Sequence, residues 1–141
     1  ATAIDKKAIE KVILVVDDSS VARNQIKKAV SGLGFNIVLA KDGRDGLNKL
    51  REMAVDGPIS EQVALMISDI EMPEMDGYTL TAEVRNDPSL NGLYVILHTS
   101  LSGVFNQAMV AKVGANDFIA KFNPDELAGA VLKALKADDP S

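Results

Sequence analysis

The stretch Leu65-Met66-Ile67-Ser68-Asp69-Ile70-Glu71-Met72-Pro73-Glu74-Met75-Asp76-Gly77 decides the fold of this chain. An apolar run ends there at a single carboxylate. The residues after it read as a loop, because proline lacks an N–H and glycine is a typical turn residue. We therefore expect Asp69 at the carboxyl end of a buried strand, which is where open α/β sheets bind ligands. An acidic surface loop after a core strand is the competing interpretation, and Asp69 alone does not decide between them.

Four other short apolar segments have the length of strands. The clearest is a continuous aliphatic run at 12–16, the pattern of a strand that is buried on both faces of a parallel sheet. The expected strands cover 12–16, 36–40, 65–68, 94–98 and 118–120. Because five helical patterns alternate with them, the sequence predicts an α/β fold, a doubly wound parallel sheet with five helices on its two faces.

The helices are expected from apolar residues at helical spacing and from residues that begin or end helices. Ser19 or Ser20 caps the first, Gly77 opens the third, and Asn123 with Pro124 begins the last. The segment 54–62 reads as a polar loop. We expect the inward face of the fourth helix to carry Phe105, Ala108, Met109 and Val113.

Composition narrows the class of protein. The 141 residues are 47% hydrophobic and 25% charged, which suits one folded domain rather than a disordered chain. The net charge of −5, without a basic stripe, argues against nucleic-acid binding. The absence of cysteine removes disulfides and thiolate chemistry. With no apolar run long enough for a membrane span and no secretory leader in this sequence, we expect a cytoplasmic location.

Polar residues gather at the expected strand ends. Asp17 and Asp18 follow the first strand, Asp69 the third, Thr99 and Ser100 the fourth, and Lys121 the fifth. In a parallel sheet these ends lie along one edge, so the residues converge on one crevice. Three carboxylates would repel one another unless a cation joined them, and an all-oxygen cluster suits Mg²⁺.

Such a cluster has the parts that phosphoryl transfer to a carboxylate requires. One carboxylate attacks, a metal neutralises the phosphoryl oxygens, and a cation and a hydroxyl hold the transferred group. Lys121 and Thr99 supply the last two. Each residue alone is weak evidence, but all of them fall at strand ends.

The chain also resembles the receiver domains of bacterial response regulators. The resemblance rests on Val15-Val16-Asp17-Asp18-Ser19, the segment 69–77, Thr99-Ser100, and Gly114-Ala115 followed by Lys121. It covers about residues 12–136. It implies a flavodoxin-like fold with strand order 2-1-3-4-5.

The same resemblance implies roles for the site residues. Asp69 is the phospho-acceptor, and Mg²⁺ is bound by Asp18, Asp69 and the backbone carbonyl of Glu71, with Asp17 assisting through water. Thr99 and the Ser100 N–H contact the phosphoryl group, and Lys121 pairs with it. Thr99 and Phe118 are the expected switch residues.

The amino-acid sequences of 17–26, 94–103 and 120–127 are similar to those of the receiver domain in CheV-type chemotaxis proteins. In that family a CheW-like coupling domain precedes the receiver and links chemoreceptors to the histidine kinase CheA. The resemblance implies that this chain is the C-terminal half of such a protein, with a CheA-like kinase as donor. Residues 1–11 would then be a linker, 12–136 the receiver domain and 137–141 a C-terminal tail.

Two positions depart from the receiver pattern. Phe122 follows Lys121 where many receivers have proline, which removes the expectation of a cis peptide bond. Phe118 stands where the switch aromatic is often tyrosine, so a hydroxyl hydrogen bond is lost.

His98 raises a separate question. It could act as a general base or phospho-acceptor, but a strand-end histidine beside Leu97 is more often a packed structural residue, and we favour that interpretation.

Two other functions compete with the phosphoryl switch. A Mg²⁺-dependent phosphohydrolase would need Asp-x-Asp after the first strand and a cap domain, whereas Asp17 and Asp18 are adjacent and no cap insertion exists. A flavodoxin would need a phosphate loop there, and the two carboxylates would repel the flavin phosphate.

Overall fold

The computed structural model describes residues 11–98, 107–119 and 124–137. The strands are β1 (Val12–Val16), β2 (Asn36–Ala40), β3 (Val63–Asp69), β4 (Val95–His98) and β5 (Asp117–Ile119). The helices are α2 (Ser20–Ser31), α3 (Gly43–Asp56), α4 (Ile59–Gln62), α5 (Gly77–Asn86), α6 (Gln107–Val113) and α7 (Pro124–Ala137). None of the helices within these ranges is long and apolar enough to cross a membrane.

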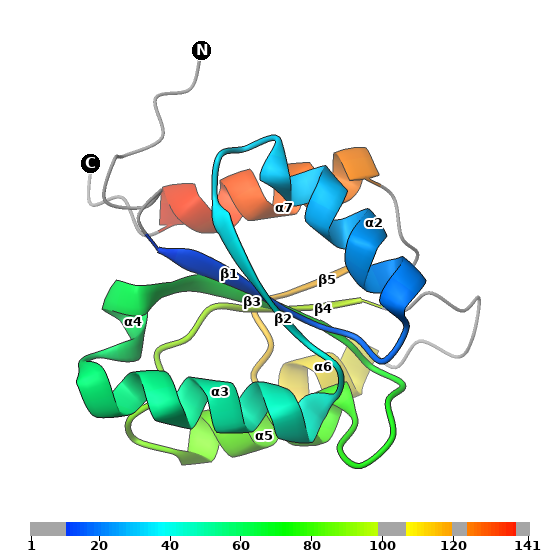
Figure 1. The fold of residues 1–141 in the computed structure, drawn as a ribbon. Coiled ribbons are helices and arrows are strands. Elements are labelled where there is room, and N and C mark those ends of the chain that lie inside the picture. The colour runs from blue at the N-terminus through cyan, green and yellow to red at the C-terminus, as the bar shows by residue number, and fades with distance from the viewer. Residues whose placement is uncertain (1–10, 99–106, 120–123, 138–141) are drawn as a thin grey trace.

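The five strands form one sheet in the order β2-β1-β3-β4-β5, and every neighbouring pair is parallel. Helices α2 and α7 cover one face of the sheet, whereas α3, α5 and α6 cover the other (Figure 1). The strand order reverses at β1, because β2 lies on one side of β1 and β3 lies on the other. This arrangement confirms the flavodoxin-like order expected from the sequence, and it places the carboxyl ends of β1 and β3 side by side.

Side-chain alternation along the strands divides the core into two clusters. Ile13 and Val15 of β1 pack with Ile26 and Val30 of α2 and with Val131 of α7. The intervening strand residues face the other way, towards α3 and α5, in a cluster that includes Leu14, Val16, Leu47, Leu50 and Leu80. Both faces of β1 are therefore buried, which is why this strand reads as a continuous aliphatic run.

The structure corrects several details of the sequence prediction. The segment expected as a polar loop, 54–62, contains the end of α3 and the short helix α4, so the described residues form six helices rather than five. Ile59 explains the difference, because it is only 4% exposed and ties this segment to the core. Ala108 of α6 is exposed rather than inward, and Val110 takes the buried position.

The helices that follow β1, β2 and β3 each begin with a side-chain cap. Ser19, Asp42 and Asp76 accept hydrogen bonds from the backbone N–H groups of Ala22, Asp45 and Thr79 at 3.2, 2.8 and 2.7 Å. Such caps fix where the chain turns from strand to helix. They therefore hold three strand-to-helix connections in place at one edge of the sheet.

Arg85 of α5 joins three segments at the opposite edge. Its guanidinium donates to the backbone carbonyls of Gly114, Asn91 and Leu93 at 2.9, 2.9 and 2.6 Å. It also donates to the side-chain oxygen of Asn116 at 2.7 Å. One side chain thus connects α5 with the start of β4 and the turn that leads into β5.

Replacing Arg85 with alanine should lower the free energy of unfolding by about 2–3 kcal/mol, because several half-buried carbonyls would lose their donor. Urea denaturation monitored by circular dichroism measures the change. Arg51→Ala is the matched control, since Arg51 makes longer, exposed ion pairs with Glu83 and Asp87 at 3.8 and 3.5 Å. The control should leave the unfolding midpoint nearly unchanged, and equal losses in both variants would contradict this role of Arg85.

Candidate functional site

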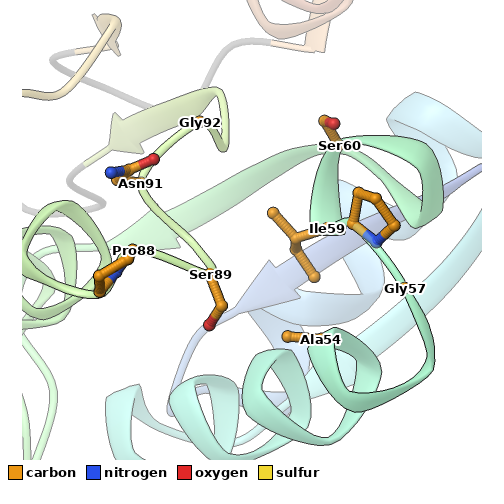
Figure 2. A pocket seen from close by; sticks show the side chains of 9 residues that line it. Ala54, Gly57, Ile59, Ser60, Pro88, Ser89, Asn91 and Gly92 are labelled. Carbon is orange, nitrogen blue, oxygen red and sulfur yellow. The ribbon is translucent and has the colours of Figure 1, made fainter.

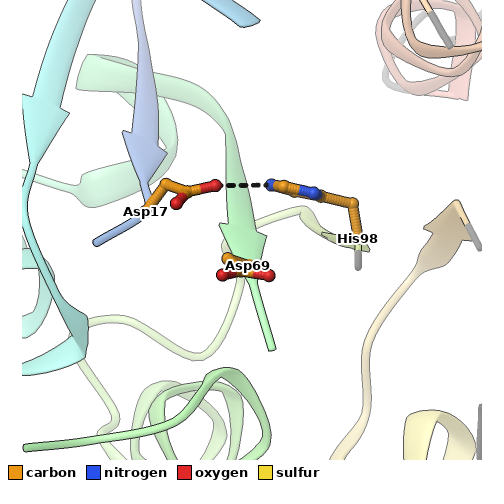
Figure 3. A group of neighbouring side chains, drawn as sticks. All are labelled: Asp17, Asp69 and His98. Carbon is orange, nitrogen blue, oxygen red and sulfur yellow. Dashed lines mark ion pairs between the residues drawn. The ribbon is translucent and has the colours of Figure 1, made fainter. Parts of the chain in front are cut away.

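Three side chains meet at the carboxyl edge of the sheet. Asp17 follows β1 directly, Asp69 ends β3 and His98 ends β4 (Figure 3). Asp69 and His98 are register partners in the β3–β4 ladder. One potential ligand atom from each of the three residues lies within 4.8 Å of those of the other two.

Strand alternation explains why these three side chains lie on one face. Val15, Ile67 and Ile96 all belong to the cluster beneath α2 and α7. Asp17, Asp69 and His98 each lie two residues further along the chain, and residues two apart in a strand point to the same side. The polar group is thus the last layer of that apolar core, at the point where the strands end.

The three side chains are nearly inaccessible to solvent. Asp17, Asp69 and His98 are 1%, 4% and 2% exposed. The Asp17 Oδ2 and the His98 Nε2 are 3.5 Å apart, as the dashed line in Figure 3 marks. Among the described residues, neither this carboxylate oxygen nor either ring nitrogen of His98 has a hydrogen-bond partner.

Burial and like charges perturb the acidity of the site. The pKa of Asp69 is raised to about 7, first by burial and then by the charges of Asp17 and Asp18. Hydrogen bonds from the backbone N–H groups of Ile70 and Glu71 partly offset that rise in pKa. Burial also raises the pKa of Asp17, against the hydrogen bond that the Ser19 N–H donates to it at 2.9 Å.

His98 lies in the site, although sequence reasoning treated it as a packed structural residue. It is indeed buried, and burial lowers its pKa to about 4, so the ring is neutral at pH 7. Its imidazole nevertheless faces Asp17, with Nε2 3.5 Å from Asp17 Oδ2 (Figure 3). The sequence contains a feature that indicates this position: His98 is the last residue of β4, as Asp69 is the last residue of β3.

The loop after β3 folds back onto the strand end that carries Asp69. The Gly77 N–H donates to the Ile70 carbonyl at 2.8 Å, and a Cβ added at Gly77 would collide with the Asp69 carbonyl oxygen. Within the loop, Glu74 has a φ of 67° and the Met75 N–H donates to the Pro73 carbonyl, a three-residue turn. Only glycine allows the first turn of α5 to approach Asp69 so closely.

The remaining residues singled out from the sequence fall into two groups. Asp18 and Glu71 are exposed beside the buried group, and Phe118 is partly buried against the core on the α3 and α5 side. Thr99, Ser100 and Lys121 lie outside the described residues, as do Phe105, Phe122, Asn123 and residues 1–10 of the expected linker. Their predicted roles stay predictions.

A cavity of 310 Å³ lies elsewhere, between the α3–α4 connection and the loop that precedes β4 (Figure 2). Its lining includes Pro58, Ile59, Pro88 and Asn91 and contains no ionisable side chain. It adjoins the amino-terminal ends of β3 and β4, so it is remote from Asp69. The titratable groups therefore point to the strand-end cluster rather than to this cavity.

The donor set of that cluster fits a divalent cation. Two buried carboxylates stand side by side, and Asp18 contributes a third negative charge that raises the pKa of both. A bound cation would remove this mutual repulsion and would satisfy the carboxylate oxygen of Asp17 that has no hydrogen-bond partner.

Comparison with known proteins gives concordant matches. The family model described as the response regulator receiver domain matches residues 13–132. Over 132 residues the chain is 33% identical to the chemotaxis protein CheV3 of Helicobacter pylori, covering 92% of this chain and 42% of CheV3. It is 30% identical to Protein PilG of Pseudomonas aeruginosa, covering 92% of this chain and 87% of PilG. The chain spans less than half the length of the first curated relatives it matches.

Solved structures agree with these sequence matches. The signal receiver domain of a histidine kinase from Syntrophus aciditrophicus superposes with a TM-score of 0.78 at 30% identity, covering 93% of this chain and 94% of that one. The chemotaxis protein CheY4 of Vibrio cholerae superposes with a TM-score of 0.74 at 25% identity, covering 88% and 98%.

Gly77→Ala should destabilise the fold by about 1–3 kcal/mol, because the new methyl group would displace the backbone at Asp69. Chemical denaturation measures the loss. Gly129→Ala is the control within another helix, α7, where an added Cβ meets nothing within 4 Å. That control should gain up to about 1 kcal/mol from helix propensity, and a neutral Gly77→Ala would contradict the close approach.

Asp69→Asn should stabilise the metal-free protein progressively as the pH rises from about 4 to 8. The unfolded carboxyl titrates near 3.8 and the folded one at about 7, so between these values the folded state holds a proton that unfolding releases. Wild-type stability falls with pH there, and asparagine removes the penalty, by on the order of 4 kcal/mol at pH 8. Urea unfolding in EDTA at several pH values measures it.

The control for this experiment is Asp45→Asn. The ion pair and hydrogen bond with Lys49 at 2.9 Å lower the pKa of Asp45, so its carboxylate stabilises the fold above its unfolded pKa. The control should therefore lose stability at neutral pH and recover it in acid. A stability difference between Asp69→Asn and wild type that does not vary with pH would exclude a raised pKa at Asp69.

Proposed function

Since the chain belongs to the response regulator receiver domain family of two-component and chemotaxis proteins, we propose that Asp69 accepts a phosphoryl group and that the chain works as a switch. The observation that carries the proposal is the position of Asp69, a buried carboxylate at the end of the central strand β3 with Asp17 beside it. Receiver domains are regulatory switches, so the chemistry serves to change the state of the protein rather than to turn over a substrate.

The proposed step transfers a phosphoryl group from a phosphohistidine to Asp69. A carboxylate oxygen of Asp69 attacks phosphorus, the phosphorus–nitrogen bond breaks, and the imidazole nitrogen leaves with the electron pair. Asp69 must be ionised to attack. The Ile70 N–H, which donates to its Oδ1 at 2.9 Å, helps to hold the carboxylate in one orientation.

Receiver domains bind Mg²⁺ at this acidic pocket, and we propose that Asp17, Asp18, Asp69 and the backbone carbonyl of Glu71 hold it here. When bound, the ion neutralises charge on the carboxylates and on the phosphoryl oxygens. Asp18 is exposed, so it can bind from the solvent side, whereas the buried Asp17 carboxylate accepts a hydrogen bond from the Ser19 N–H at 2.9 Å. Arg23 further fixes this turn by donating to the Asp17 carbonyl.

The switch would follow from the added charge. Phosphorylation brings roughly −1.5 to −2 charges and strong hydrogen-bond acceptors, which we propose recruit Thr99, the Ser100 N–H and Lys121. Phe118 is the aromatic residue proposed to change position, and its packing against the core on the α3 and α5 side supports a link between site and surface. The expected coupling to a partner is about 1–3 kcal/mol, a shift in populations.

The relatives suggest a chemotaxis role. We propose a CheA-like histidine kinase as donor and cytoplasmic coupling to a chemoreceptor array through a CheW-like domain, as in CheV-type proteins. In that arrangement residues 1–11 are a linker, 12–136 the receiver and 137–141 a tail. The phosphorylated receiver would tune the receptor–kinase array or act as a phosphate sink.

Incubation with acetyl phosphate tests the acceptor. The wild-type chain should gain about 80 Da, one phosphoryl group, in the presence of Mg²⁺ and not in EDTA, because an activated aspartate attacks the donor directly. Intact-protein mass spectrometry measures the gain, and Asp69→Asn is the control that should show none. A normally phosphorylated Asp69→Asn variant would exclude Asp69 as the acceptor. Wild type without a mass gain, and without binding of beryllofluoride, would exclude the switch.

A further inference from the structure

We propose that His98 is a metal ligand, and that it makes this pocket select first-row transition ions such as Mn²⁺, Co²⁺ and Ni²⁺ more strongly than an all-oxygen site would. The juxtaposition of Asp17, Asp69 and His98 carries this inference. It rests on the proposed function to the extent that both place a cation in the same acidic pocket.

Buried polar atoms of this group lack hydrogen-bond partners. His98 is 2% exposed, and within the described parts of the chain neither of its ring nitrogens has a hydrogen-bond partner. Asp17 Oδ2 is in the same condition at 1% exposure. Leaving such groups unpaired in the protein interior destabilises the fold. A metal ion between them would satisfy a nitrogen and an oxygen at once.

The distances between the potential ligand atoms also suit a bound ion. The Asp17 Oδ2 and the His98 Nε2 are separated by 3.5 Å, and an oxygen of Asp69 completes a triangle with sides of at most 4.8 Å. Two ligands bound at about 2.1 Å to one ion are about 3.4 Å apart in tetrahedral geometry and about 3.0 Å apart at neighbouring octahedral positions. The Asp17–His98 separation is therefore close to the edge of a coordination sphere, and Asp69 joins it if its side chain moves towards the other two.

The donor atoms of the three side chains differ in the metal ions that they bind best. Mg²⁺ prefers oxygen ligands in octahedral geometry, whereas a neutral imidazole nitrogen suits transition metals. The backbone places His98 beside Asp69, because the two are register partners in the β3–β4 ladder. A site with two carboxylates and one imidazole should still bind Mg²⁺ through its oxygens. Its affinity for transition ions should be higher, and it should increase from Mn²⁺ through Co²⁺ to Ni²⁺.

A simple structural ion pair explains the geometry less well. The 3.5 Å that separates Asp17 Oδ2 from His98 Nε2 is long for a hydrogen bond, and within the described residues neither atom has a hydrogen-bond partner. The ring therefore lies close to two carboxylates without a hydrogen bond to any of the described residues.

The chain offers an unusually clear test, because His98 is its one histidine. The tag-free protein is loaded with Mn²⁺ and examined by pulsed electron paramagnetic resonance, with unlabelled histidine and with ¹⁵N-labelled histidine. A nitrogen coupling that changes with the histidine label would place His98 on the metal. A spectrum that is identical for both labels would overturn the proposal, and this measurement needs no variant that has to fold.

Affinity supplies the second readout. Co²⁺ and Mg²⁺ are titrated by calorimetry into wild type, His98→Leu and Asp18→Asn. Losing even an indirect metal contact typically costs 10- to 100-fold, so His98→Leu should lower Co²⁺ affinity at least about tenfold while changing Mg²⁺ affinity little. Asp18→Asn is the matched control and should weaken both ions. Equal Co²⁺ affinity in wild type and His98→Leu would contradict a nitrogen ligand.

The same samples separate this inference from the proposed function. Acetyl phosphate with Mg²⁺ should phosphorylate the wild-type protein, because Asp69 is the proposed acceptor whether or not His98 binds the metal. Phosphorylation without any histidine-dependent metal signal would leave the switch standing and overturn the role of His98. A histidine-dependent metal signal without phosphorylation would support the role of His98 and contradict the proposed switch.

Discussion

The structure depends on one electrostatic constraint, the burial of two carboxylates next to each other at the end of the sheet. Asp17 and Asp69 come from neighbouring parallel strands, and both lie on the face that the strand alternation assigns to the core beneath α2 and α7. Neither can be ionised there without a cost, which is why the pKa of each is raised. Binding of a cation next to the two carboxylates would offset the free-energy cost of ionising them. This gain is the physical basis for a cation-binding site.

The surrounding chain is arranged to hold this pair rather than to relieve it. Caps at Ser19 and Asp76 start the helices that follow β1 and β3, and the Ile70 N–H is directed at the Asp69 carboxylate. Gly77 lets α5 begin directly against the strand end. These contacts involve backbone groups, so they fix the carboxylates through local geometry. The far edge of the sheet is organised differently, because there Arg85 links three segments through neutral carbonyls.

Much of the fold could be predicted from the sequence, because its signals are local. The aliphatic run of β1, Ser19 as a cap and the strand order implied by the receiver resemblance are all confirmed, and so are the resemblances to receivers and to CheV-type proteins. The errors came where tertiary contacts decide. Nothing in the polar segment around Gly57 indicates α4, which forms because Ile59 reaches the core, and helical spacing alone placed Ala108 inward where Val110 is buried.

The residues that end the strands, and with them the acidic site, can be predicted from local sequence patterns, because parallel strands bring their carboxyl ends to one edge whatever the packing around them. The place of His98 in that site depends instead on contacts between distant parts of the chain. A histidine after an aliphatic run has the same local pattern whether its ring packs against apolar neighbours or faces a carboxylate. The choice depends on the register of β4 against β3, on which face of the sheet the ring lies, and on the 3.5 Å that separate it from Asp17, a residue 81 positions earlier in the chain.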